Sequence, residues 1–453
     1  MRIPRRVMLI TSVVAAATLP LTPAAHAAGV ASHSASNRAF SPQVIHTGTG
    51  PTGYEVTFRY KDPTAASVQI KGEWYFANLS DISAPASTAT SVVTTPGLLP
   101  SQWRPGDFPI ASPNSTAANW PVSSMTKNPD GVWTYTTPLP SGVFSYGFYV
   151  NCTSSAQSGC TEVSDPANPP WNASGSVEPT SQVYVPSDPR FGTVSYSWQA
   201  PARGPHGTLT DITYSSPGHV TPAGKNYLAI YTPPGYDPDR AQPYPTLYLN
   251  HGGGGSEVDW STQGDLGNIM DNLIDTGQIQ PMVVVMPNAN GYPSSADNSA
   301  FDSDLISNII PYVESHYHVS ASASERAFSG LSAGGLITNS LMLYHAGEFG
   351  YYGVMSAGLP CPSPGCTTVA LTPAQAAALK GAGIFVGGGW QDPVHAAGYK
   401  GNDTGTVQEV SALVNAGLAV TPDFINGGHE WYVWRILLKD FLTRVAFFPA
   451  LAG

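Results

Sequence analysis

The period of the apolar positions changes near residue 190, so the two halves of the chain predict different secondary structure. Between about residues 41 and 188, short runs of alternating, β-branched and aromatic residues are separated by Gly, Pro, Asn and Asp, which is typical of strands and turns. Four such runs stand out, at residues 54–61, 66–74, 131–139 and 142–151. Short strands at this spacing favour a β-sandwich.

Beyond residue 206, strand-like runs at 226–232, 246–250 and 282–287 alternate with helical patterns. In segment 304–317 the apolar residues fall on one helical face, at Leu305, Ile306, Ile309, Ile310 and Val313. Pro311 lies inside this stripe and predicts a kink or a late start of the helix. Short apolar strands that alternate with amphipathic helices favour an α/β fold with a mostly parallel sheet.

The N-terminus is interpreted as an export signal. Three arginines within the first six residues precede an apolar run and an "AHA" cleavage site, so residues 1–27 predict a secreted protein. The paired arginines leave the general and the twin-arginine export routes both open. The run is too short and too interrupted for a membrane helix, and no later segment predicts one.

The patterns divide the rest of the chain into four predicted parts. An Ala/Ser-rich segment at 28–40 is expected to be disordered. It is followed by an all-β sandwich at 41–188, a linker at 189–206 and an α/β domain at 207–453.

Charge and cysteine content narrow the functional classes. The formal net charge of -11 argues against nucleic acid as a partner. The four cysteines form two local pairs, Cys152 with Cys160 and Cys361 with Cys366, and two short-loop disulfides are the simplest interpretation in an oxidising compartment. A metal site of four thiolates is the alternative, which the C-x7-C and C-x4-C spacings and the separation of the pairs disfavour. No other metal-ligand pattern is evident.

The pentapeptide "GLSAG" at 330–334 places one hydroxyl between glycines, after an apolar run and before a helical one. This G-x-S-x-G pattern is typical of a sharp strand-to-helix turn whose strained backbone tolerates only tiny neighbours. It predicts Ser332 as a nucleophile, with the amide of Ala333 directed at the developing oxyanion. An ordinary glycine-rich turn is the alternative.

A second glycine-rich stretch, "YLNHGGGGSEVDW" at 248–260, begins at a predicted strand end. Such a loop can direct another backbone N–H into an oxyanion hole, and Gly253 is the candidate donor. His251 precedes the serine in the chain and is interpreted as structural rather than as the base. A flexible loop without catalytic geometry is the alternative.

A serine nucleophile needs a base, and the base needs an acid that orients it. The stretch "GGHEW" places His429 on a turn before the final helix, and we expect it to be the base rather than a surface cap of that helix. Asp392 follows an apolar strand in "GWQDP" and is the expected acid, with Asp403 and Asp423 as the fallbacks. The order serine, acid, histidine is that of α/β-hydrolases.

On these motifs, residues from about 205 to 450 resemble the putative-esterase family of α/β-hydrolases, which includes feruloyl and acetyl xylan esterases of carbohydrate esterase family 1. The likeness is carried by "HGGGGSEVDW", "IIPYVE", "RAFSGLSAGG", "GWQDP" and "GGHEWYVWR". It implies the roles already given to Ser332, Asp392, His429 and the amides of Gly253 and Ala333. Two features depart from the family: Ala333 stands where members often carry Met, and loop 358–366 is expected to be closed by a disulfide.

The N-terminal part, with "VTFRYKDPTAASVQIKGEW" and "NPDGVWTYTTPLPSGVFSYGFYV", is similar to the immunoglobulin-like early-set domain found before such esterases. That domain is related to sugar-binding modules for starch and glycogen. Trp74, Trp133 and Tyr146 are expected in the sandwich core, and stacking on sugars is the alternative.

The resemblance implies a secreted serine ester hydrolase that needs no cofactor and acts on esters of plant cell-wall polysaccharides, feruloyl esters above all. Trp260, Trp390 and Trp431 lie close in sequence to the catalytic motifs and are candidates for an aromatic pocket, with core packing as the alternative. The other functions to weigh are an acetyl xylan esterase, an acyltransferase of the mycolyl transferase type and a non-catalytic carbohydrate-binding protein. The oligomeric state is left open.

Overall fold

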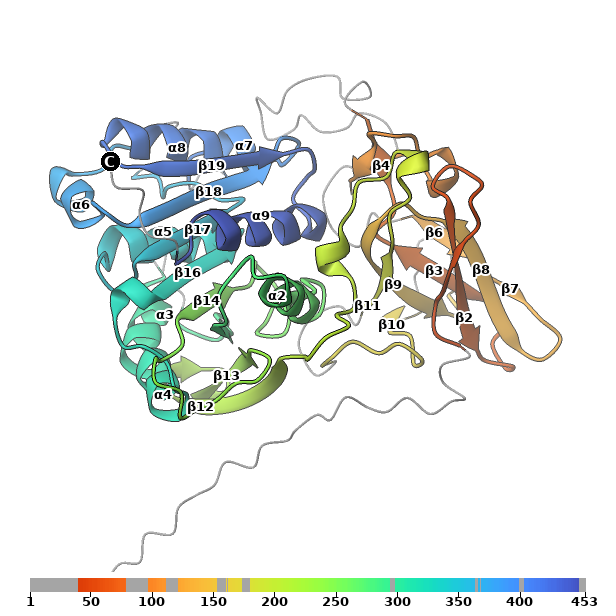
Figure 1. Ribbon diagram of the computed structural model, residues 1–453, viewed down its shortest axis with the longest axis horizontal. Helices are drawn as coiled ribbons and strands as arrows, with labels where there is room; N and C mark the ends of the chain where they lie inside the picture. The colour runs from red at the N-terminus through yellow and green to blue at the C-terminus, as the bar shows by residue number, and fades with distance from the viewer. Residues whose placement is uncertain are drawn as a thin grey trace, which may run out of the picture.

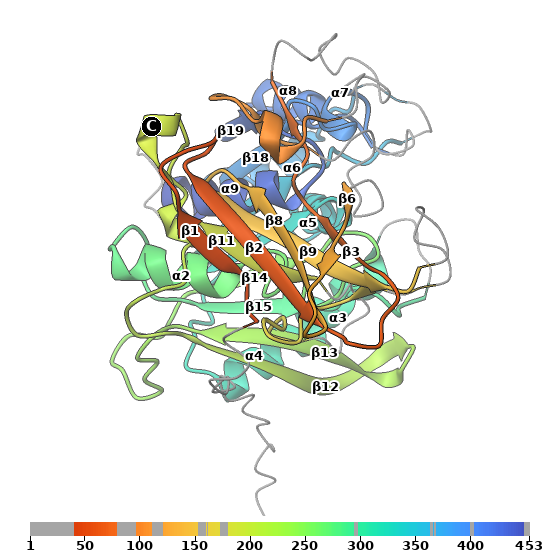
Figure 2. The same ribbon diagram turned by 90° about the vertical axis from the view of Figure 1, so that its right-hand side faces the viewer.

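The chain builds two β-structures of different kinds, which are joined by an extended connection in the computed structural model (Figures 1 and 2). The structure describes residues 40–78, 97–110, 121–152, 160, 162–172, 180–293, 298–362, 366, 368–398 and 403–447. The predicted export signal and the segment that follows it, up to residue 39, lie outside these ranges.

The N-terminal part consists of antiparallel sheets. One has the order β1 (Gln43–His46), β2 (Tyr54–Lys61), β8 (Val132–Pro138) and β7 (Thr126–Lys127). The other has the order β10 (Glu162–Val163), β9 (Gly142–Val150), β3 (Val68–Gly72) and β6 (Val122–Ser124), with β11 (Ser181–Val185) also paired to β9. β4 (Phe76–Ala77) and β5 (Phe108–Pro109) form a short ribbon. The four predicted strands are confirmed as β2, β3, β8 and β9.

Aromatic side chains from both sheets fill one core, which makes this part a sandwich. The ring of Phe58 lies 4.6 Å from that of Tyr146 and 5.3 Å from that of Trp74, measured between centroids. Trp74, Trp133 and Tyr146 are all buried, so they pack in the core as expected. Because aromatic rings bury large areas, this cluster supplies much of the sandwich's hydrophobic stabilisation.

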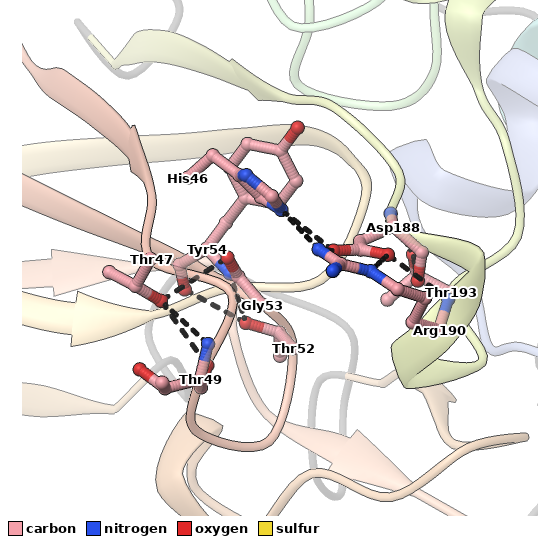
Figure 3. A network of polar contacts seen from close by, with 9 residues as sticks. All are labelled: His46, Thr47, Thr49, Thr52, Gly53, Tyr54, Asp188, Arg190 and Thr193. Carbon is pink, nitrogen blue, oxygen red and sulfur yellow. Dashed lines mark hydrogen bonds and ion pairs between the residues drawn. The ribbon is translucent and has the colours of Figure 1, made fainter.

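A polar network fixes the end of the sandwich to the connection that follows it (Figure 3). The Asp188 carboxylate lies 2.7 Å from His46 Nε2 and accepts a hydrogen bond of 2.7 Å from Arg190 Nη2. These hydrogen bonds, from Arg190 first and then from His46, hold the pKa of Asp188 well below its usual range. The carboxylate therefore stays charged at neutral pH and ties the short 3₁₀ turn Pro189–Phe191 to strand β1.

The C-terminal part is built on one eight-stranded sheet. Its order is β12 (Thr208–Val220), β13 (Ala223–Thr232), β15 (Val283–Pro287), β14 (Thr246–Asn250), β16 (Arg326–Leu331), β17 (Tyr351–Met355), β18 (Gly383–Gly389) and β19 (Val420–Ile425). The six strands β15, β14, β16, β17, β18 and β19 are parallel to one another, whereas β12 pairs antiparallel with β13 and β13 pairs antiparallel with β15. The predicted mostly parallel sheet is confirmed.

Helices cover both faces of this sheet. On one face, α2 (Leu266–Asp275) and α9 (Trp431–Arg444) bury their apolar sides. The other face is covered by α3 (Ser299–Asp304), α4 (Ile310–His316), α5 (Ala333–Tyr344) and α8 (Thr406–Asn415). The short helices α6 (Pro373–Ala378) and α7 (Val394–Ala397) complete the set in the described residues. Alternate residues of the central strands enter the two cores, as in sheets that are buried on both sides.

The helix predicted over 304–317 differs from expectation at its start. It begins at Ser299 as α3 and passes through a π-helical turn, Leu305–Ile309, before α4. Pro311 lies in the first turn of α4, where it lacks the N–H needed for a helical bond and its ring crowds the carbonyl four residues earlier. The wider π turn accommodates the proline, so the helix is interrupted rather than shortened.

Both predicted cysteine pairs form disulfides, Cys152 with Cys160 and Cys361 with Cys366. Across the described residues, none of the helices combines the length and the apolar content needed to cross a bilayer.

We expect Phe58→Ala to lower the free energy of unfolding by about 3–5 kcal/mol, because it removes a ring from the centre of the sandwich core. Denaturant titration followed by tryptophan fluorescence measures the change. Ile45→Ala, at a residue that is 51% exposed, is the control and should change stability by no more than about 0.5 kcal/mol. Similar losses in the two variants would contradict the assignment of this core.

Candidate active site

The three residues predicted as nucleophile, acid and base follow three strands of the large sheet. Ser332 follows β16, Asp392 lies just after β18 and His429 lies just after β19. Because these strands are parallel, their carboxyl ends share one edge of the sheet. In Figure 1 the arrows of β18 and β19 point toward the sandwich, so this edge faces the N-terminal part.

The turn at Ser332 is strained and crowded. Ser332 has φ 52° and ψ −115°, and its N–H donates a hydrogen bond of 2.8 Å to the Met355 carbonyl. A methyl group built on Gly330 would lie 2.5 Å from the Gly334 carbonyl carbon, and one on Gly334 would lie 2.6 Å from the His251 oxygen. Both glycines are therefore required, because helix α5 begins in direct contact with the strand ends.

The structure brings Ser332, His429 and Asp392 into one hydrogen-bonded line. His429 Nε2 lies 2.9 Å from Ser332 Oγ, and His429 Nδ1 lies 3.0 Å and 3.1 Å from the two Asp392 oxygens. Asp392 is fully buried, whereas a quarter of the His429 side chain is exposed. This is the geometry that an activated serine requires: a base in contact with the hydroxyl and an acid on the far ring nitrogen.

The two fallback acids lie elsewhere. Asp403 accepts a hydrogen bond of 3.2 Å from the Gly358 N–H. Asp423 pairs with Arg444 at 3.0 Å, and burial and the neighbouring Asp440 raise its pKa to about 6.

Charge and burial act in opposite directions on the pair. Burial by itself would lower the pKa of His429, but the charge of Asp392 and its hydrogen bond raise it above the ordinary value of 6.5. For Asp392, burial raises the pKa, and the charge and hydrogen bond of His429 outweigh burial and lower it. Asp392 therefore stays ionised and supports positive charge on the imidazole.

Sequence reasoning missed one residue that contacts the acid. Ser356 follows β17 with φ 53°, and its hydroxyl accepts a hydrogen bond of 3.0 Å from Trp434 Nε1. The same hydroxyl hydrogen-bonds to Asp392 and helps to lower its pKa. The available signal was its place directly after the strand-like "YGVM", at the edge where the other polar residues gather.

His251 fixes the glycine loop that carries the predicted oxyanion donor. Burial lowers its pKa to about 4, so the ring is neutral at physiological pH. Its Nε2 accepts a hydrogen bond of 3.0 Å from the Ala289 N–H, which leaves the proton on Nδ1 for donation to the Gly252 carbonyl at 2.6 Å. The structural interpretation of His251 agrees with these contacts.

This contact also sets the direction of the Gly253 amide. In a planar trans peptide the carbonyl and the N–H point in opposite directions, so holding the Gly252 carbonyl turns the Gly253 N–H away from His251. A methyl group on Gly253 would lie 3.8 Å from the Ala333 β-carbon, so the loop adjoins the start of α5. Ala333 is the first residue of that helix, where amides have no intrahelical partner.

The three candidate pocket tryptophans have different environments. Trp260 and Trp431 are buried, with ring centroids 5.2 Å apart, and the Trp260 N–H donates to the Asn250 carbonyl at 2.9 Å. Both therefore pack in the core rather than line an open pocket. Trp390 precedes Asp392 by two residues and is 45% exposed. Its ring packs against those of His395 and Phe424.

Within the described ranges, no group of three or more His, Cys, Asp or Glu side chains is arranged to hold a metal ion.

Comparison with known sequences identifies relatives of this chain. Residues 221–445 match the family described as Putative esterase. An endo-1,4-beta-xylanase/feruloyl esterase from Xylanibacter ruminicola is 30% identical over 70% of this chain and 40% of its own length. An endo-1,4-beta-xylanase Y from Acetivibrio thermocellus is 39% identical over 25% of this chain and 11% of its own length. The chain thus spans less than half of the length of these relatives.

Comparison with solved structures supports the fold over both parts of the chain. The enterobactin esterase from Shigella flexneri has a TM-score of 0.50 at 17% identity, with 89% of this chain and 95% of that protein covered. The large mixed sheet is therefore of the α/β-hydrolase type, as the sequence predicted.

The raised pKa of His429 predicts the acid limb of activity. Since only the neutral imidazole can accept the serine proton, kcat/KM for an aryl ester should fall as the pH drops through a pKa above 6.5. In Asp392→Asn the residual activity should have its acid limb at lower pH, because burial then acts on His429 without the opposing charge. Stopped-flow pH profiles of both proteins measure the shift, and unchanged limbs would contradict the coupling.

We expect His251→Phe to lower kcat for the same ester by about tenfold to a hundredfold, with little change in KM. The loss should stay below the roughly 10²–10³-fold cost of removing an oxyanion donor, because the Gly253 amide remains but is no longer held in direction. His318→Phe is the control, since it breaks a comparable 2.8 Å contact between a histidine and a backbone carbonyl, that of Arg240. Arg240 lies shortly before the amino-terminal end of β14, whereas the candidate catalytic residues follow the carboxyl ends of the strands. Equal kcat values in the two variants would disprove the role of His251.

Proposed function

We propose that this chain, a carboxylic ester hydrolase whose residues 221–445 belong to the putative-esterase family, cleaves esters attached to plant cell-wall polysaccharides, with feruloyl esters preferred. The observation that carries the proposal is the line from Asp392 through His429 to Ser332, with 3.0 Å and 2.9 Å between successive groups. Ser332 is the nucleophile, His429 the base and Asp392 the acid that orients it.

In the first half-reaction the Ser332 oxygen attacks the ester carbonyl carbon while its proton passes to His429 Nε2. The carbonyl oxygen becomes an oxyanion, which accepts hydrogen bonds from the Gly253 and Ala333 amides. The imidazolium is stabilised by the buried Asp392 carboxylate on its Nδ1 side. When the C–O bond breaks, the Nε2 proton goes to the leaving alcohol oxygen, and the acyl group stays on Ser332.

The second half-reaction repeats these steps with water. His429 takes a proton from the water molecule, whose oxygen attacks the acyl carbon. The second oxyanion accepts hydrogen bonds from the same two amides. The proton on His429 Nε2 then passes to Ser332 Oγ as the free acid leaves. In each half-reaction His429 thus first accepts a proton and then donates it, and the free Ser332 hydroxyl is restored at the end.

The substrate class rests on the relatives and on one exposed aromatic residue close in sequence to Asp392. The name of the Xylanibacter ruminicola protein gives two activities, xylanase and feruloyl esterase. We propose that this chain shares the feruloyl esterase activity. Trp390, which is 45% exposed and precedes Asp392 by two residues in the chain, is the residue that we propose to contact an aromatic acyl group or a sugar ring.

The remaining features fit a protein that works outside the cell. The two disulfides are stable in an oxidising compartment, in keeping with residues 1–27 as an export signal. We propose that the sandwich over 41–188 is an immunoglobulin-like domain, connected through 189–206 to the esterase domain over 207–453.

The test is hydrolysis of methyl ferulate, an aryl acetate and acetylated xylan by the wild-type protein and by Ser332→Ala. We expect methyl ferulate to be the best substrate and the mutant to lose at least about 10³-fold in kcat with its fold intact. Circular dichroism and the thermal midpoint check the fold.

Other outcomes would redirect the assignment. Preference for acetylated xylan would make the protein an acetyl xylan esterase. Turnover that appears only when an acceptor alcohol is added would make it an acyltransferase. A mutant as active as the wild type would overturn the role of Ser332.

A further inference from the structure

One buried guanidinium connects the sandwich to the esterase domain next to the catalytic histidine. Arg435 lies in α9, six residues after His429, and is 1% exposed. Its three nitrogens donate to three separate segments: Nε to the Gln263 carbonyl at 2.9 Å, Nη1 to the Val143 carbonyl at 2.8 Å, and Nη2 to the Glu73 carboxylate at 3.2 Å.

Two of the three segments belong to the sandwich. Val143 lies in β9, and Glu73 directly follows β3. The Glu73 N–H donates to the Ser145 carbonyl at 2.9 Å, and its carboxylate accepts from the Ser145 N–H at 3.4 Å, so Glu73 is fixed to β9 as well. The sandwich therefore presents a carbonyl from β9 and a carboxylate from the residue directly after β3.

The third segment leads back to the oxyanion loop. Gln263 ends the stretch that begins at His251 and carries Gly253, and the chain enters α2 at Leu266. Arg435 thus connects the helix that follows the base with the loop that supplies the predicted oxyanion donor. A guanidinium suits this role because its donors are fixed in one plane and it remains charged.

A second residue of α9, Tyr432, also contacts the sandwich. The Tyr432 hydroxyl lies 3.0 Å from that of Tyr196, and its ring packs against a small apolar cluster of the sandwich formed by Ala77, Phe108 and Ile110. Figure 1 shows α9 running from its contact with the sandwich along the face of the esterase sheet. The base loop is thus held between β19 and a helix whose first turns contact the other domain.

Two half-open pockets adjoin these contacts. A cavity of about 230 Å³ is lined by residues that include Val143, Thr262 and Asp265, and another of about 190 Å³ by residues that include Trp103 and Tyr432. The hydrogen bonds of Arg435 and the packing of Tyr432 therefore connect α9 to the sandwich at the edges of these pockets, and Trp171 of the sandwich adds an apolar contact to the esterase core that includes α9.

We infer that Arg435 is a positioning residue for ester hydrolysis and that the sandwich, through Glu73 and Val143, holds the base and the oxyanion loop in register. The inference rests on the proposed function of Ser332 and His429. It implies that the sandwich contributes to kcat even for an ester too small to touch it, which a tethered substrate-binding module would not do.

The test uses p-nitrophenyl acetate and the full chain. Arg435→Met alone leaves the Glu73 charge buried without its partner, so the decisive variant is the double change Glu73→Gln with Arg435→Met, which removes both charges together. We expect kcat to fall by about tenfold or more with KM nearly unchanged, since displacement of catalytic groups by ~1 Å can cost roughly 10²-fold. Titration with a fluorophosphonate counts the folded active sites, so the loss is expressed per site.

A purely structural role would not move the pH profile. If α9 shifts, Asp392 supports His429 less, and the acid limb of kcat/KM moves to lower pH than in the wild type. Arg435→Lys, which keeps the charge and part of the hydrogen bonding, should recover part of kcat. Arg444→Met is the matched control, because Arg444 lies in the last turn of the same helix and pairs with Asp423 within the esterase domain.

The outcomes separate the two proposals. A wild-type protein that neither hydrolyses the ester nor reacts with the fluorophosphonate would remove the proposed function itself. An active wild type together with a double variant of equal kcat per site and equal acid limb would overturn the inference while leaving the function in place.

Discussion

The direct contact between helix α5 and the ends of two strands is the constraint on which the candidate active site depends. Gly330 and Gly334 leave no room for a β-carbon, so α5 starts against the backbone of β14 and the turn at Ser332 is forced into φ 52°. The residue is held there by neighbouring structure, because a non-glycine residue does not adopt this backbone freely. The serine hydroxyl, the Ala333 amide and the glycine loop at Gly253 are all placed by that one contact.

The charge state of each titratable group at the site follows from how deeply it is buried and from its hydrogen-bond partners. Asp392 can be buried as a carboxylate because His429, Ser356 and the Val394 amide all stabilise its charge. A quarter of the His429 side chain stays exposed, which suits the proposed role as a base. His251 is the opposite case, a histidine kept neutral by burial so that it acts as a fixed hydrogen-bond donor. Two histidines at one site thus differ in function because their surroundings differ.

The sequence was informative where chemistry or periodicity imposes a local pattern. Ser332, Asp392 and His429 each follow a strand and have a glycine within three residues, so they could be placed before their distances were known. Strand β12 escaped prediction because it lies at the sheet edge and most of its residues are polar or exposed. Trp260 and Trp431 showed the limit of proximity along the chain, since the direction of a side chain is set by tertiary packing. Arg435 carried no local signal at all, because its partners lie in distant segments.

The bridging guanidinium also bears on how such proteins can be recombined. Modular enzymes are often treated as cassettes, in which one binding domain can be exchanged for another across a linker. Here the acceptors for Arg435 are a carbonyl on β9 and a carboxylate after β3. A foreign domain would have to place both acceptors within hydrogen-bond distance of the same guanidinium. A graft that lacks them would leave an uncompensated cation in the junction beside the base helix. An exchange that keeps these contacts would have to move the sandwich together with the esterase part.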